Sequence, residues 1–120
     1  AASDVYKRQI LRPWLFKLLV GDTPKYFSYL RIGENLIIGT PCDFSGELIG
    51  PIEKSISNKK LNLMINSFNG GYVGYITDDK WYDKNDINTY ETYTMNWYGP
   101  YNGLYFSRLI KKIIEINESN

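Results

Sequence analysis

The side chains able to do chemistry in this chain are carboxylates, phenols and one thiol, because none of its 120 residues is a histidine. Without imidazole, the chain alone cannot build a Ser-His-Asp or Cys-His catalytic group, or the usual histidine-based zinc site. Gly70-Gly71 follows a predicted strand, but two glycines with no lysine behind them are a weak phosphate-binding signal. The candidates for chemistry therefore lie in the acidic and tyrosine-bearing segments.

Asp43 follows an apolar stretch, residues 36–39, that is typical of a strand covered on both faces. A carboxylate just past the carboxyl end of such a strand lies where α/β proteins build their sites. A second interpretation is that Asp43 only caps the next helix, and the residue type alone favours this one. Cys42 is interpreted as a small packed residue, because no base is present to activate its thiol.

Tyrosines mark two further segments. Glycine and tyrosine alternate in Gly71-Tyr72-Val73-Gly74-Tyr75, which suggests close backbone approach with phenols on one side. Tyr90-Glu91 lies within residues 78–98, which are polar and aromatic without a clear period and predict a long loop. Such loops are often functional, although a tyrosine in a loop is more often a packing or surface residue than a ligand.

Four short motifs occur in a fixed order: Pro41-Cys42-Asp43-Phe44, Gly74-Tyr75-Ile76-Thr77, Tyr90-Glu91 and Tyr98-Gly99-Pro100. Together they resemble the closing part of the catalytic domain of the neutral, non-lysosomal ceramidases, over residues 10–116. The resemblance implies a zinc site of two histidines, a glutamate and a tyrosine. Asp43 stands at the glutamate position, Tyr75 is the tyrosine ligand, and Tyr90 lies near the scissile amide.

The resemblance also implies a function. A zinc-dependent amidase would hydrolyse the N-acyl bond of ceramide-like lipids to a fatty acid and a sphingoid base, at a secreted or periplasmic location with possible membrane-surface contact. The histidines are expected in an upstream half of the same domain, so the chain alone is expected to be inactive. Aspartate is one methylene shorter than glutamate, and Glu47 is a less suitable substitute ligand. A relative that kept the fold but lost the metal is therefore an alternative.

A binding module is the other alternative. The segment before the last helix is rich in aromatic side chains that can stack on sugars or lie against lipid. These are Trp81, Tyr82, Tyr90, Tyr93, Trp97, Tyr98 and Tyr101.

Composition narrows the class of protein. With 43% hydrophobic and 22% charged residues, the chain is typical of a globular domain rather than a disordered one. A net charge of +1 argues against a nucleic-acid partner. A single cysteine excludes an internal disulfide, and no apolar run approaches the length of a transmembrane helix. Residues 1–9 resemble the translation of a sequencing-library adapter, so we expect the native domain portion to be 10–120.

Hydrophobic periodicity predicts the elements. Strands are expected over 26–32 and 36–39, joined by a hairpin turn at 33–35, and then over 61–68 and 72–76. Helices are expected over 10–19, over 44–57 with a kink or a break at Gly50-Pro51, and over 101–118. Asp43 or Ser45 would cap the second helix. The buried stripe predicted for the last helix comprises Tyr105, Phe106, Leu109, Ile110, Ile113, Ile114 and Ile116.

Strands and helices alternating in this way predict an α/β fold, with a mixed β-sheet flanked by helices, as part of a larger domain. If Asp43 and Tyr75 share a metal, their side-chain oxygens should face one cleft, even without the metal.

Overall fold

The computed structural model of the chain describes residue 18, residues 25–83 and residues 95–119. Its strands are β1 (Ser28–Ile32), β2 (Asn35–Gly39), β3 (Asp43–Phe44), β4 (Asn62–Asn66) and β5 (Tyr75–Ile76). Its helices are the 3-10 helices η1 (Gly46–Leu48) and η2 (Asp79–Asp83) and the α-helices α3 (Ile49–Ser55) and α5 (Gly103–Glu118). The α/β class with a mixed sheet is confirmed.

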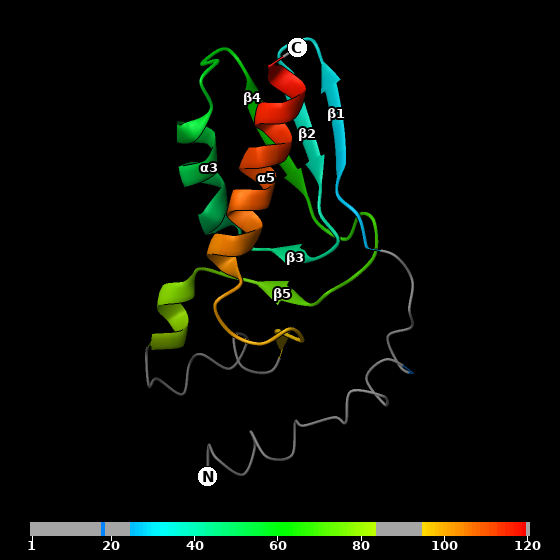
Figure 1. Ribbon diagram of the computed structural model, residues 1–120, viewed down its shortest axis with the longest axis vertical. Coiled ribbons are helices and arrows are strands. Elements are labelled where there is room, and N and C mark those ends of the chain that lie inside the picture. Colours follow the sequence, from blue (N-terminus) through cyan, green and yellow to red (C-terminus); the bar gives the residue numbers. More distant parts are fainter. Residues whose placement is uncertain (1–17, 19–24, 84–94, 120) are drawn as a thin grey trace.

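The larger sheet has the strand order β1-β2-β4 (Figure 1). β1 and β2 form the expected antiparallel hairpin, and Gly33 adopts the left-handed conformation in its turn, with a φ of 60°. β2 then runs parallel to β4, which makes the sheet mixed. A parallel partner needs a crossover connection, and here β3, η1 and α3 lie along that connection.

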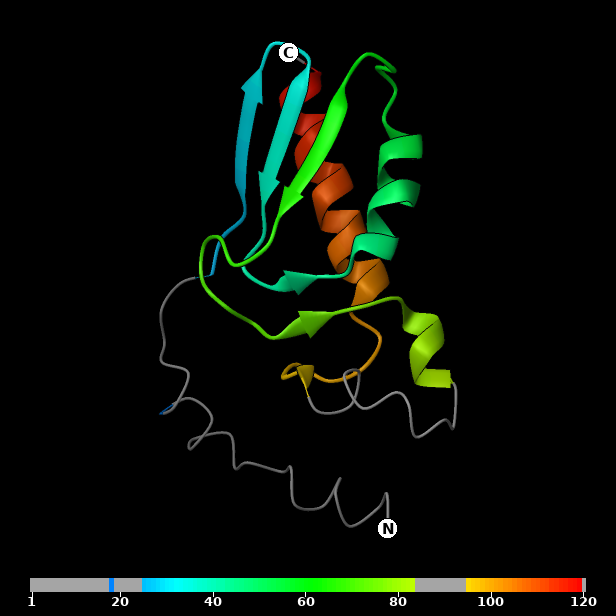
Figure 2. The same cartoon turned by 180° about the vertical axis from the view of Figure 1, so that it is seen from behind.

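α3 and α5 lie on one face of this sheet, and no described helix lies on the other (Figure 2). Leu36 and Ile38 of β2 are fully buried, whereas Ile37 between them is only half-buried. Successive residues of a strand point to opposite faces, so Ile37 faces the side without a helix. The expectation that this strand is covered on both faces is therefore not met by the described residues.

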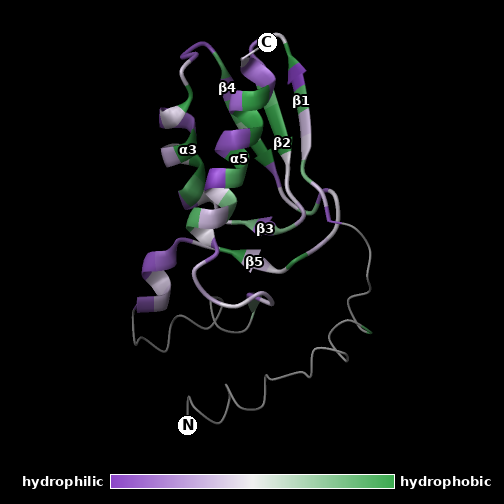
Figure 3. Cartoon of the chain, in the orientation of Figure 1, coloured by the Kyte–Doolittle hydropathy of each residue, from purple (hydrophilic) through white to green (hydrophobic). Residues whose placement is uncertain are grey.

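The core joins β2 and β4 to the two helices through Ile52 of α3 and Ile110 and Ile114 of α5. Hydrophobic residues concentrate in β2 and alternate with hydrophilic ones along α5 (Figure 3). The buried stripe predicted for α5 is partly wrong, because Tyr105 and Ile116 are exposed. In their place Gly103 and Ser107 are buried, since small residues allow the helix to approach its neighbours closely.

A helix over 44–57 is also corrected. Asp43 and Phe44 instead form β3, which pairs with β5 in a second, two-stranded sheet. Neither Asp43 nor Ser45 caps a helix through its side chain, because Asp43 belongs to a strand and Ser45 makes no capping bond to η1. Gly50 and Pro51 cause no break, since both lie in the first turn of α3, where a missing N–H costs nothing.

The segment after β4 differs in two places from the predicted elements. The strand expected over 72–76 is shorter, because only Tyr75 and Ile76 pair. η2 lies where part of a loop was expected. The arm at 1–9, the helix over 10–19 apart from residue 18, and Tyr90 lie outside the described residues. Among the described helices, none is long and apolar enough to cross a membrane.

Candidate functional site

Asp43 and Tyr75 are brought together by the two-stranded sheet. They are register partners on the parallel strands β3 and β5, followed by the partners Phe44 and Ile76. Phe44 and Ile76 are buried in the hydrophobic core, whereas Asp43 and Tyr75 are half-buried. Because side chains alternate along a strand, Asp43 and Tyr75 share the face of this small sheet that points away from the core.

Backbone hydrogen bonds hold this pair in register. The N–H of Asp43 donates to the carbonyl of Gly74 at 3.0 Å, and the N–H of Ser45 donates to the carbonyl of Ile76 at 2.9 Å. The N–H of Val73 extends the ladder to the carbonyl of Pro41 at 2.7 Å. The hydrogen-bond ladder that pairs the two short strands therefore extends beyond the residues of β3 and β5 themselves.

Gly74, directly before Tyr75, lies against the segment that precedes α5. Its φ is 92°, which glycine adopts readily, and a Cβ there would lie 2.7 Å from the carbonyl oxygen of Met95 and 2.9 Å from the amide nitrogen of Trp97. The close approach predicted for the glycine–tyrosine segment is therefore present at this position. Only a glycine at position 74 lets the 95–97 backbone lie this close to it.

Glu47 ties the segment after Asp43 to the segment after Tyr75. Its Oε1 accepts hydrogen bonds from Thr77 Oγ1 at 2.9 Å and from Trp81 Nε1 at 2.6 Å, and its Oε2 accepts from Lys80 Nζ at 2.9 Å. The side chain is 29% exposed. Burial by itself would raise the pKa of Glu47, but the hydrogen bonds from Lys80, Trp81 and Thr77 outweigh it, so the pKa is lowered.

This carboxylate is a positioning group rather than a spare metal ligand. Both of its oxygens already accept hydrogen bonds from side chains of η2 and of Thr77, which follows β5, so binding a metal would break those bonds. The sequence did not predict this role, because the three donors lie about 30 residues further along the chain. The one sequence signal is an acidic residue just after the candidate ligand, with a threonine shortly after Tyr75.

Cys42 is confirmed as a packed residue. It is fully buried in the core cluster next to Asp43. Burial raises the pKa of the Cys42 thiol to about 11, and the Asp43 charge acts in the same direction against the effect of a hydrogen bond with Thr40. Since the thiolate is the reactive form, Cys42 is unsuited to nucleophilic chemistry at neutral pH.

Tyr72 lies close enough to Asp43 for the two side chains to interact electrostatically. Burial raises the pKa of Tyr72, and the negative charge of Asp43 raises it further. The Tyr72 ring stacks on Phe68, with ring centroids 5.4 Å apart and planes 18° apart, and meets Trp97 edge-on at 4.8 Å. An aromatic cluster of Phe68, Tyr72 and Trp97 therefore adjoins the Asp43–Tyr75 pair.

As a metal site, the described residues offer two oxygen ligands on one face. A carboxylate oxygen and a tyrosine oxygen would fill two positions of a tetrahedral zinc shell, which needs further ligands. In the described part of the chain, no group of three histidine, cysteine, aspartate or glutamate side chains is placed to hold a metal. Any complete site would therefore draw ligands from elsewhere.

Comparison with known proteins finds no matching family model, no matching curated protein and no matching solved structure. What the chain does must therefore be argued from the residues and their geometry.

Proposed function

We propose that this chain contributes Asp43 and Tyr75 to the zinc site of a ceramidase-like amidase, whose histidine ligands lie in sequence upstream of it. The observation that supports this most directly is the register pairing of Asp43 with Tyr75. The two residues occupy separate motifs, and nothing in their local sequence requires them to meet. Their common position on the face away from the core is the arrangement that two ligands of one metal need.

Each of the three candidate site residues has a role in this proposal. The Asp43 carboxylate and the Tyr75 phenol supply oxygen ligands, and the Tyr75 phenol would also stabilise negative charge developing on the amide oxygen. Tyr90 orients the substrate. Zinc, when bound, supplies Lewis-acid polarisation of the carbonyl and acidifies water. Hydrolysis adds water across the amide C–N bond, so that the acyl carbon takes the hydroxyl and the sphingoid nitrogen takes the proton.

The β3–β5 ladder and the Glu47 bonds support this site by keeping it rigid. A ligand whose position is fixed before the metal arrives binds it more tightly, because less freedom is lost on binding. Asp43 is fixed through its own backbone N–H, and Tyr75 is fixed on its C-terminal side through the Thr77–Glu47 bond. A shorter aspartate in place of glutamate requires such close pairing of the two strands.

The test uses a longer version of the protein that includes its upstream sequence, assayed with a fluorescent ceramide analogue. Hydrolysis is expected, with loss of activity to a chelator and recovery with zinc. Asp43→Ala should abolish zinc retention, and Asp43→Glu should preserve it. Tyr75→Phe should lower kcat by about a hundredfold with little change in KM, because the phenol is needed most in the transition state.

Glu53→Ala serves as a matched control, since Glu53 is an exposed carboxylate on α3. It should leave zinc content and rate unchanged. The 120-residue chain by itself is expected to show no hydrolysis with or without zinc. A longer protein that binds no zinc, or whose activity is indifferent to Asp43→Ala, would favour a relative that kept the fold without the chemistry.

A further inference from the structure

Phe68 is held in a conformation that is unfavourable in two ways. Its φ is 58°, in the left-handed region that costs a residue with a Cβ about 1 kcal/mol. Its side chain is also 64% exposed, although it is fully apolar. A strained backbone at a bulky residue persists only where the surroundings impose it, and such positions cluster at ligand-binding sites.

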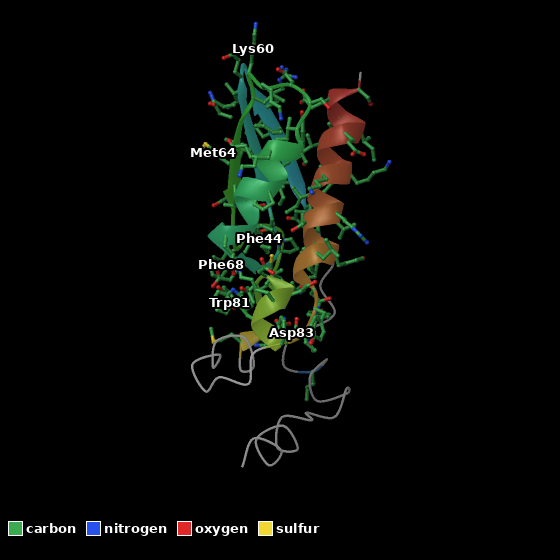
Figure 4. The ribbon with its side chains drawn as sticks, turned by 90° about the vertical axis from the view of Figure 1, so that its left-hand side faces the viewer. Phe44, Lys60, Met64, Phe68, Trp81 and Asp83 are labelled. Carbon is green, nitrogen blue, oxygen red and sulfur yellow. The ribbon has the colours of Figure 1, made fainter. Side chains whose placement is uncertain are left out.

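Hydrogen bonds to the segment that carries Asp43 impose this conformation. The N–H of Phe68 donates to the carbonyl of Cys42 at 3.0 Å, and the N–H of Asn69 donates to the carbonyl of Thr40 at 2.9 Å. The N–H of Phe44 donates to Ser67 Oγ at 3.0 Å. The turn at 67–69 is thus bound to both sides of Asp43. Figure 4 shows Phe68 and Met64 of β4 on the side of the molecule that lies away from α5.

The surroundings of Phe68 fit an apolar ligand better than a sugar. Aromatic sugar sites combine a ring with polar side chains that bind the hydroxyls. The two polar side chains beside Phe68 are used inside the protein, since Ser67 accepts from Phe44 and Asn69 Oδ1 accepts from Ser28. What this turn presents outward is a ring stacked on Tyr72, which in turn contacts the 42% exposed Trp97.

We propose that Phe68, Tyr72 and Trp97 form the surface that binds the aliphatic chain of an amphiphilic substrate, with the polar end of that substrate at Asp43 and Tyr75. The position of the polar end rests on the proposed function. Binding of the aliphatic chain does not rest on the proposed function, because the three rings and the turn that holds them lie within the described residues and need no metal. Phe68 thereby determines specificity for long-chain substrates without contacting the reacting atoms.

The first experiment measures binding of fatty N-methylamides of increasing chain length to the 120-residue chain, by calorimetry below their micelle concentrations. Affinity should rise by about tenfold for each pair of methylene groups added, until the chain outgrows the aromatic surface. Phe68→Asn removes the ring while asparagine tolerates the left-handed conformation. This variant should bind the longest amide about tenfold more weakly, and Trp97→Ala should do the same.

Tyr101→Asn is the matched control. Tyr101 is the other described residue besides glycine with a positive φ, at 63°, and is 52% exposed, but its hydroxyl donates to Asp83 and its ring contacts Tyr82. It should bind the amides as the unaltered chain does. The thermal midpoint of Phe68→Asn should stay the same or rise, because relief of backbone strain offsets the lost ring stacking.

Several results would overturn the proposal. These are an affinity independent of chain length, equal binding by Phe68→Asn, or equal losses in Phe68→Asn and Tyr101→Asn. Tighter binding of a soluble oligosaccharide than of the long amide would instead assign the rings to a sugar. If the amides bind as expected but the longer protein hydrolyses no ceramide analogue, the binding surface stands and the proposed function fails.

Discussion

Two regions of the molecule are stabilised in different ways. The sheet region consists of β1, β2, β4, α3 and α5, and its strands and helices contribute to the core cluster the aliphatic residues Leu36, Ile38, Ile52, Leu63, Ile110 and Ile114. The pair region consists of residues 40–48, 67–83 and 95–102 around β3 and β5. Backbone hydrogen bonds, the Glu47 carboxylate and close glycine contacts hold it together.

The two regions also differ in how many of their residues have a positive φ. In the sheet region, Gly33 at the hairpin turn is the one described residue with a positive φ. Among the described residues, the pair region contains all the others, which are Phe68, Gly70, Gly71, Gly74, Gly99 and Tyr101. Regular hydrophobic patterns build the sheet region, whereas unusual backbone conformations, which often cluster at functional sites, gather in the pair region.

The largest expected effect is in the sheet region. Ile38 is fully buried on β2, so Ile38→Ala should lower the free energy of unfolding by about 3 kcal/mol, through lost burial and the cavity left behind. Urea denaturation followed by circular dichroism measures the change. Met64→Ala, on the exposed side of β4, is the control and should cost about 0.5 kcal/mol. Equal losses in the two variants would mean that the helices do not pack on this sheet as described.

Gly74→Ala should have the next largest effect and should be confined to the pair region. The added methyl would meet backbone atoms of Met95 and Trp97, at a φ of 92°, at a cost of about 2 kcal/mol. Gly33→Ala, where a Cβ meets nothing within 4 Å, should cost about 1 kcal/mol from the φ alone. Amide chemical shifts should move around Tyr75 in the first variant only. Similar costs in both variants would show that Gly74 does not lie in close contact with residues 95–97.

Glu47→Gln should have a smaller effect that depends on pH. The variant loses the ion pair with Lys80 and weakens the bonds from Thr77 and Trp81, so we expect a loss of about 1 kcal/mol at neutral pH. The pKa of Glu47 is lowered in the folded state from its ordinary value of 4.5. Its contribution is therefore complete above pH 4.5 and disappears as the pH falls through the lower folded-state pKa.

Denaturation of Glu47→Gln and the unaltered chain across this pH range measures the difference. The two stability curves should converge in acid and separate above pH 4.5. A constant difference at every pH would show that Glu47 acts only through its shape, and that its charge does not hold the pair region together.

Lys112→Ala should have the smallest effect. The Lys112 ammonium lies 3.8 Å from Glu115 on α5, and both side chains are well exposed. Exposed ion pairs of this kind contribute about 0.3 kcal/mol or less, and salt screens them. Thermal unfolding should barely shift, and high salt should remove the difference. A shift as large as that of Glu47→Gln would mean that surface charge stabilises both regions equally.

Local sequence patterns determined most of the sheet region. Alternating and continuous apolar residues around Gly33 predicted the β1–β2 hairpin, and the apolar period after residue 101 predicted α5. Both depend on neighbours close in sequence, so periodicity and turn chemistry are enough to find them. The same patterns misjudged Tyr105 and Ile116, because which side of a helix is buried is decided by what packs there.

Only the tertiary structure decided the pair region. The local sequence favours Asp43 as the cap of a helix, but its pairing with β5 places it in a strand instead. A strand of two residues leaves no periodic signal, because its stability comes from hydrogen bonds to a distant segment rather than from its own side chains. The resemblance to a family led to the expectation that Asp43 and Tyr75 meet, but the bonds of Glu47 and the strain of Phe68 arise from contacts between segments far apart in the chain. Such contacts exist only once the sheet region has brought those segments together.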